Sequence, residues 1–346
     1  MATRALELPQ YPLYSTTFSI HRLSPLWHGQ AALDNAALQS HASRFRDILA
    51  GDVLRGVRVG LDAEDGALAR VGALRRVVWR LLREEEDWQV EGEDTQMEVD
   101  TAGHERPSIG IHIEITYEKG LYTAFLLHQN GGPAIAQPGF SYYPLMLTRM
   151  PGALRESLFD YISANFDSRA SAMKLTSGSL VSSLEKYITD ITTNENGPLE
   201  TSQANETLRT TLKDILVSIT FNLPSGSSSI KAIDITIPRD DIWPMVTRGR
   251  RLRPMMETTE PLITALAHYI NGHLALDIND GHVSISKVAC GAFVLGAEGR
   301  IKLFPSPRER DEEGVQIRAT KTLLSSLIEL AKTSRMAKEA IIQVAS

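Results

Sequence analysis

The hydrophobic positions of the chain change their period several times, and each change predicts a new element. Isoleucines occupy every second position over residues 109–115, which predicts a strand with one apolar face. A turn at Glu118-Lys119-Gly120 and an apolar run over 121–128 follow, so this region predicts an antiparallel hairpin. Further strands are expected over residues 13–20, 53–61, 142–148, 214–221, 230–237, 274–278, 283–288, 292–295 and 301–304.

Apolar residues three or four apart predict helices elsewhere. Residues 67–83 carry Leu68, Val71, Leu74, Val78, Leu81 and Leu82 at helical spacing, with arginines between them. A helix opening at Met150-Pro151 has one apolar face, formed by Leu154, Leu158, Tyr161, Ile162 and Phe166. Other helices are expected over 179–191, 260–271 and 320–344, and Asp240-Asp241 has the character of a helix start. Hairpins grouped with helices predict an α+β fold with a largely antiparallel sheet.

The length of 346 residues corresponds to about two domains at roughly 150 residues each. Residues 192–205 are rich in Asn, Glu, Thr and Gly and are predicted to form a linker. We therefore expect an N-terminal α+β region over 1–200 and a C-terminal α+β region over 206–346, the latter ending in the long helix.

Composition excludes several classes of protein. Hydrophobic residues make up 42% of the chain and charged residues 23%, values that exclude collagen-like and wholly disordered proteins. The single cysteine, Cys290, excludes an intramolecular disulfide and a multi-cysteine zinc site, and favours a reducing compartment. No stretch approaches the ~18–20 uncharged apolar residues of a membrane span, so a soluble intracellular protein without a membrane partner is expected.

The formal charge of −6 is unevenly distributed. Ten acidic residues and no Lys or Arg lie between Glu84 and Glu105. These carboxylates repel one another and cannot bury enough apolar surface to offset chain entropy, so a disordered acidic loop is predicted near 90–106, within the aperiodic stretch 91–107.

Two groups of arginines are candidates for contact with DNA, because guanidinium groups bind phosphates in a bidentate manner. They are Arg75, Arg76, Arg80 and Arg83 in the first group and Arg248, Arg250, Arg251 and Arg253 in the second. For the first group, a solvated helix face, or pairing with Glu84–Asp87 or with acids of another subunit, is an alternative explanation. The pI near 5.9 is unlike that of a stand-alone DNA-binding protein.

The sequence contains no motif for a known catalytic mechanism. The patterns G-x-x-x-x-G-K-S/T, G-x-G-x-x-G and G-x-S-x-G are all absent. A metal site can be drawn from His268, His273, His282 and Cys290, but His268 and His273 are five residues apart, whereas helical ligand pairs prefer a spacing of about four. Scattered surface or capping histidines explain them better, so neither catalysis nor a cofactor is expected.

Several blocks of sequence resemble a known family. They are LYSTTF at 13–18 with HRLSPL at 21–26, FRDIL and GDVLRGV at 45–57, YPLMLTRMP at 143–151, ISKVACGAFVL at 285–295 and EGRIK at 298–302. These blocks resemble fungal members of the CENP-L family, kinetochore subunits of the constitutive centromere-associated network. The resemblance spans roughly residues 13–304, and the acidic segment over 84–105 is not part of it.

The resemblance implies a saddle-like antiparallel sheet with flanking helices, no catalysis, and a nuclear location at the centromere and kinetochore. It also implies an obligate CENP-N-like partner, which pairs with the C-terminal sheet, and association with other inner-kinetochore subunits. Residues 282–304 are then expected at or beside the interface, with candidate contacts at Val283, Ile285, Lys287, Val288, Phe293 and Leu295. Homodimerisation and weak or indirect contact with centromeric DNA stay open. The alternatives are a metal-dependent enzyme using the His268–Cys290 region and a stand-alone nucleic-acid-binding protein.

Overall fold

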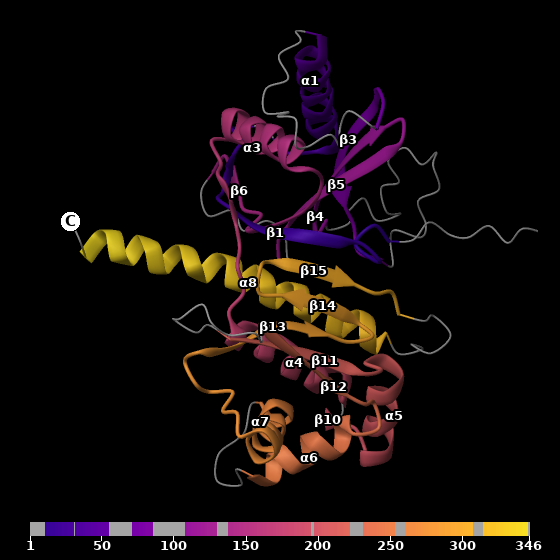
Figure 1. Ribbon diagram of the computed structural model, residues 1–346. Helices are drawn as coiled ribbons and strands as arrows, with labels where there is room; N and C mark the ends of the chain where they lie inside the picture. The colour runs from indigo at the N-terminus through magenta and orange to yellow at the C-terminus, as the bar shows by residue number, and fades with distance from the viewer. Residues whose placement is uncertain are drawn as a thin grey trace, which may run out of the picture. The chain divides into compact units, whose positions relative to one another are not determined.

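The computed structural model describes residues 11–30, 32–54, 71–85, 108–129, 138–194, 197–221, 231–252, 260–306 and 314–344 (Figure 1). The chain forms two compact units. Unit 1 comprises Met1–Leu13, Phe18–Ala172 and Leu327–Ser346, and unit 2 comprises Tyr14–Thr17 and Met173–Ser326. Among the described helices, none is long and apolar enough to cross a membrane.

Unit 1 is built on an open antiparallel sheet with the strand order β3-β4-β5-β7-β1. The strands are β1 (Thr17–Leu23), β3 (Leu74–Leu82), β4 (Gly110–Tyr117), β5 (Gly120–Leu127) and β7 (Leu145–Arg149), and β8 (Ala170–Ala172) pairs with β1. A short pair, β2 (Leu26–Trp27) and β6 (Phe140–Ser141), lies apart from this sheet. The helices are α1 (Asn35–Leu54) and α3 (Gly152–Phe166).

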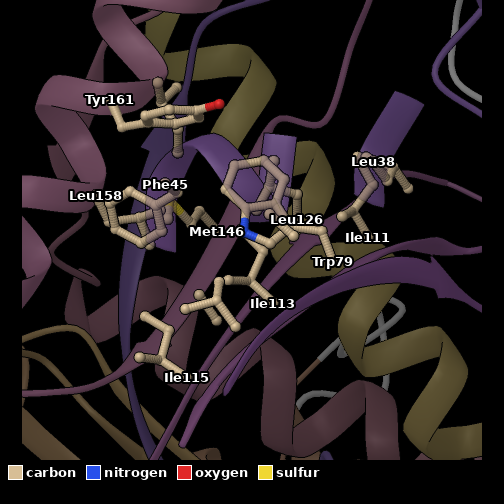
Figure 2. Packing of buried hydrophobic residues seen from close by; sticks show 14 of the residues in the cluster. Leu38, Phe45, Trp79, Ile111, Ile113, Ile115, Leu126, Met146, Leu158 and Tyr161 are labelled. Atoms are coloured by element: carbon tan, nitrogen blue, oxygen red, sulfur yellow. The ribbon is translucent and has the colours of Figure 1, made fainter. Parts of the chain in front are cut away.

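Side chains from α1, α3 and one face of this sheet form a buried aromatic and aliphatic core (Figure 2). Trp79 of β3 lies at its centre, with ring centroids 5.6 Å from Tyr161 of α3 and 6.3 Å from Phe45 of α1. Ile113 of β4 is fully buried in the same cluster. Burying each such large side chain contributes about 2–3 kcal/mol, so the two helices are held to the sheet mainly by this cluster.

Unit 2 contains a second antiparallel array with the strand order β12-β11-β13-β14-β15. The strands are β11 (Ile215–Phe221), β12 (Ala232–Ile237), β13 (Val283–Ala289), β14 (Phe293–Gly296) and β15 (Arg300–Leu303). The helices are α4 (Ser177–Ile191), α5 (Thr201–Thr211), α6 (Ile242–Leu252) and α7 (Pro261–Leu274), with the short pair β9 (Thr193–Asn194) and β10 (Gly197–Pro198) between α4 and α5. The last helix, α8 (Val315–Val344), contributes its residues up to Ser326 to unit 2 and the rest to unit 1.

The α+β fold class is confirmed, because the described residues form seven helices and open, mostly antiparallel sheet. The hairpin β4-β5 and the hairpin β11-β12 lie where alternation predicted them. Helix α3 buries all five residues of its predicted face. Helices α4, α7 and α8 and strands β13, β14 and β15 also lie close to their predicted positions, whereas the saddle-like curvature stays a prediction.

The helix predicted over residues 67–83 is wrong. Residues 74–82 form strand β3, which pairs with β4 so that Val77 lies opposite Ile115 and Trp79 lies opposite Ile113. Val77 and Trp79 join the core beside α1, while Val78 and Leu82 are buried on the opposite face. A strand buried on both faces has runs of apolar residues rather than alternation, and this run happens to match helical spacing.

Other differences are local. The first 60 residues were expected to be rich in strands, but α1 occupies 35–54, and its residues Leu38, Ala42, Phe45 and Leu49 are buried at helical spacing. The strand predicted over 53–61 therefore begins inside α1, and its remainder lies outside the described residues. Helix α5 begins inside the predicted linker, and α7 extends to Leu274, where a strand had been predicted. The predicted acidic loop near 90–106 lies outside the described residues.

Candidate partner and nucleic-acid interfaces

The strands predicted to meet a partner lie inside the array of unit 2. Strand β13 pairs with β11 on one side and with β14 on the other. Strand β14 likewise pairs with both β13 and β15. Over residues 287–289 of β13 and 294–296 of β14 both sides of the strand are therefore paired, and a partner strand cannot be added there.

Most of the predicted contact side chains are also buried within unit 2. Ile285, Val288, Phe293 and Leu295 are each at most 3% exposed. The ring of Phe293 packs edge-on against Tyr187 of α4, with 5.1 Å between centroids. Val283 is half-buried and Lys287 is exposed, so among the six candidates these two side chains are the ones accessible to a partner.

A β-bulge explains why Ile285 and Val288 point to the same side although three positions separate them. Ser218 of β11 lies opposite Lys287, whereas the next residue, Ile219, lies opposite Ile285, so Ser286 is the extra residue. An extra residue reverses the alternation of side chains beyond it. The bulge therefore turns Val288 inward and leaves the cationic Lys287 in solvent.

The outer edge of unit 2's array is strand β12. It pairs with β11 from Ala232 to Ile237, and no described strand pairs along its other side. Ala232, Asp234 and Thr236 are exposed, and Asp234 Oδ1 accepts a hydrogen bond from Ser218 Oγ at 2.6 Å. Because the backbone groups on one side of an edge strand have no strand partner, β12 is suited to pairing with a strand from another chain.

Arg75, Arg76 and Arg80 of the first arginine group lie on strand β3 rather than on a helix, and Arg83 directly follows the strand. Arg75 forms an ion pair with Glu118, and Arg80 Nη2 lies 4.0 Å from Glu114 Oε2. Arg80 Nε also donates to His112 Nδ1 at 3.2 Å. Two of these four arginines are thus engaged by acids of the adjacent β4–β5 region, while Arg76 is exposed.

The second arginine group lies on α6 and is more open. Arg248, Arg250 and Arg251 are all exposed, and none forms an ion pair with an acidic residue in the described part of the chain. The guanidinium carbon of Arg250 lies 5.6 Å from the ring centroid of Trp243, a cation–π arrangement that restrains the side chain. Arg253 lies outside the described residues.

Close backbone packing fixes the position of α6 against α7. A Cβ atom built on Gly249 would lie 1.8 Å from the carbonyl oxygen of Pro261. The two helices can approach this closely because glycine has no side chain. The arginines of α6 are therefore presented on a helix whose opposite side is held tightly by α7.

The drawn metal site is not assembled in the described part of the chain, which contains no group of three His, Cys, Asp or Glu residues placed to hold a metal ion. His268 and His273 lie on α7, where the ring centroids of His273 and Tyr269 are 4.3 Å apart. The backbone amide of His282 donates a hydrogen bond to Asp280 Oδ1. Cys290 is buried, and burial raises the pKa of its thiol to about 11. Such a thiol remains protonated at neutral pH and is a poor nucleophile or ligand.

One buried carboxyl group was missed by the sequence analysis. Glu185 of α4 is 2% exposed, and its Oε1 accepts a hydrogen bond from the backbone amide of Ile263 at 2.8 Å. The sequence does hold a signal: Glu185 is four residues after Val181 and three before Ile188, on the apolar face of the predicted helix over 179–191. An acidic residue on a core-facing stripe indicates a buried polar partner.

Comparison with known proteins identifies the family. A model of the family described as Centromere protein L matches residues 12–332, nearly the whole chain, and no curated protein matches it significantly. The match covers all the strands described above and most of both units. The chain therefore belongs to the centromere protein L family, whose members are structural subunits of the kinetochore.

Proposed function

We propose that this protein is a non-catalytic scaffold subunit of the inner kinetochore, in the nucleus, which forms a heterodimer with a CENP-N-like partner. In this complex it helps to assemble the centromere-associated network on centromeric chromatin for chromosome segregation. The observation that carries the proposal is the family match over residues 12–332.

The free edge of β12 is the part of unit 2 that we propose for partner binding. Pairing there would add a strand to the existing array without breaking the β11, β13 or β14 ladders. Backbone hydrogen bonds of this kind supply affinity, and the flanking side chains supply specificity. Val283 and Lys287, the accessible members of the predicted contact set, contribute at most from the surface beside this array.

Hydrogen exchange of the purified heterodimer tests this interface. On complex formation, amides of 232–237 are expected to gain protection, whereas amides of 287–289 in β13 and 294–296 in β14, already paired on both sides, should change little. A folded complex that leaves exchange in β12 unchanged would place the interface elsewhere. A subunit that never co-purifies with a CENP-N-like protein from nuclear extract would contradict the heterodimer itself.

A second candidate function, contact with centromeric DNA within the complex, is favoured by the exposed cationic surface of α6. Arg248, Arg250 and Arg251 form no ion pair with an acidic residue in the described part of the chain, whereas Arg75 and Arg80 of β3 do. We therefore assign the larger share of any phosphate contact to α6. Because the chain carries a net charge of −6, the isolated subunit should bind DNA weakly.

The salt dependence of DNA affinity distinguishes the two arginine groups. Replacing Arg248, Arg250 and Arg251 by Gln in the heterodimer should flatten the slope of log affinity against log salt by about 0.9 for each lost phosphate contact. Glutamine is preferred to glutamate because a negative charge in the last turn would itself destabilise the helix, in addition to the loss of the stabilising cation. The matched control replaces Arg75, Arg76 and Arg80 by Gln and should flatten the slope less. Equal slopes for wild type and the α6 variant would remove the DNA role of α6.

A further inference from the structure

The first turn of α7 is held by a side chain from another helix. Pro261 opens α7 and has no N–H group, so the first amides to need a partner are those of Leu262 and Ile263. Glu260, which precedes the helix, makes no side-chain capping bond. The carboxyl group of Glu185 on α4 lies at this end of α7 instead and accepts from both amides, with 2.8 Å from Oε1 to the nitrogen of Ile263.

The carboxyl group is buried, and part of it is left without a partner. Its second oxygen, Oε2, is inaccessible and forms no hydrogen bond with a described residue. An ionised carboxylate in such a place loses its hydration on both oxygens but regains contacts on one of them. A protonated carboxyl group keeps the accepting oxygen for the two amides without a buried charge.

The charged groups that act on Glu185 come from the elements packed around it. Burial raises the pKa of Glu185 to about 8, and the negative charge of Glu260 at the start of α7 adds to this rise. The amides of Ile263 and Leu262 and the positive charge of Arg250 on α6 oppose it. Burial prevails, so the docked arrangement favours the protonated form at neutral pH.

We propose that the Glu185 carboxyl group is a proton-dependent clamp that holds the first turn of α7, and α6 with it, against α4. Helix α6 is held together with α7 because Gly249 brings the backbone of α6 into close contact with Pro261. When the first turn of α7 leaves α4, Glu185 enters solvent and its pKa returns to about 4.3. Rising pH therefore favours the open arrangement, until the docked carboxyl group is itself ionised.

The linkage gives the size of the effect. The opening equilibrium should increase by nearly tenfold per pH unit below the docked pKa, or about 50-fold between pH 6 and pH 8. This inference goes beyond the proposed function, since it concerns the placement of α6 and needs neither partner nor DNA. Its consequence for DNA contact rests on the proposed role of the α6 arginines.

Hydrogen exchange of the full-length chain, corrected for intrinsic rates, tests the clamp between pH 6 and pH 8. Protection of the α7 amides of residues 262–266 should fall by about 50-fold in the wild type. The α7 amides should also be less protected than the core amides of β11 at each pH, because the opening is local rather than global. If the α7 amides are as well protected as those of β11 at every pH, they exchange only through global unfolding and the clamp is overturned.

Two variants and a control complete the experiment. Glu185→Gln keeps the accepting oxygen but cannot ionise, so protection of α7 should become independent of pH. If this variant does not fold, Glu260→Gln supplies the test, because loss of the like charge should raise α7 protection at pH 8 relative to wild type. Glu206→Gln, on the exposed side of α5, should leave the profile unchanged. An unaltered profile in Glu260→Gln, or a pH-dependent one in Glu185→Gln, would overturn the proposal.

Discussion

Replacing Gly249 by alanine probes the contact that positions the arginine-bearing helix α6. The added Cβ would lie 1.8 Å from the carbonyl oxygen, 2.6 Å from the carbonyl carbon and 2.9 Å from the Cα of Pro261. All three atoms belong to the backbone, so no side-chain rotation relieves the clash. The two helices must separate by about 1 Å or more to restore an ordinary contact distance.

The free-energy change is the difference between two opposing effects. Alanine is favoured over glycine in a helix interior by about 1 kcal/mol, whereas forced overpacking costs about 1–3 kcal/mol and more where the backbone has to move. We expect net destabilisation of about 1–2 kcal/mol for Gly249→Ala. Separation of α6 from α7 should also weaken DNA binding by the heterodimer if α6 contacts phosphates.

Gly272→Ala is the matched control. Gly272 lies in α7, and a Cβ built there meets no atom within 4 Å. This variant should gain up to about 1 kcal/mol of stability, since only the helix-propensity difference operates. Urea unfolding followed by far-ultraviolet circular dichroism, with the slope compared among variants, measures both changes. If Gly249→Ala is as stabilising as Gly272→Ala, the close approach of α6 and α7 is refuted.

Three further predictions follow from buried groups. Val283→Asp combined with Ile285→Asp should prevent folding, because the Ile285 side chain is 3% exposed and a buried unpaired carboxylate costs several kcal/mol. The control Lys287→Asp, at an exposed site, should fold. A soluble double variant with the melting temperature of the wild type would contradict the burial of Ile285. Cys290, whose thiol pKa burial raises to about 11, should resist maleimide at pH 8 until the protein is denatured, and rapid labelling of the native chain would disprove its burial. Burial, aided by the charge of Arg155, lowers the pKa of His21 to about 4. As pH falls from 6.5 to 4 the unfolded chain therefore binds a proton before the folded chain does, and about 3 kcal/mol of stability should be lost. His21→Gln should flatten this part of the curve of unfolding free energy against pH, and a curve identical to that of the wild type would contradict the lowered pKa.

Local sequence was sufficient to predict the elements whose apolar residues all meet one surface. The isoleucines of β4 alternate because they share the face that meets α1 and α3, although His112 on the other face is also buried. Helix α3 shows helical spacing because one stripe meets the sheet. In both cases the period of the apolar residues follows directly from the geometry of a single contact surface. The resemblance that identified the family came likewise from the order of residues alone.

Tertiary structure decided the features in which two contacts compete for the same residues. Strand β3 is buried on both faces, so its apolar run carries no period that separates strand from helix. The bulge at Ser286 reverses the alternation within β13, and this places both Ile285 and Val288 in the interior.

The same holds for the candidate sites. Exposed and engaged arginines look alike in sequence, and only the fold shows that Glu114 and Glu118 lie beside β3 while α6 carries its cations in the open. Glu185 became a buried cap because folding brought residue 263 to it across 78 positions. Local periodicity reports how a segment meets one surface, whereas edge strands, bulges and buried charges depend on which distant segments become neighbours.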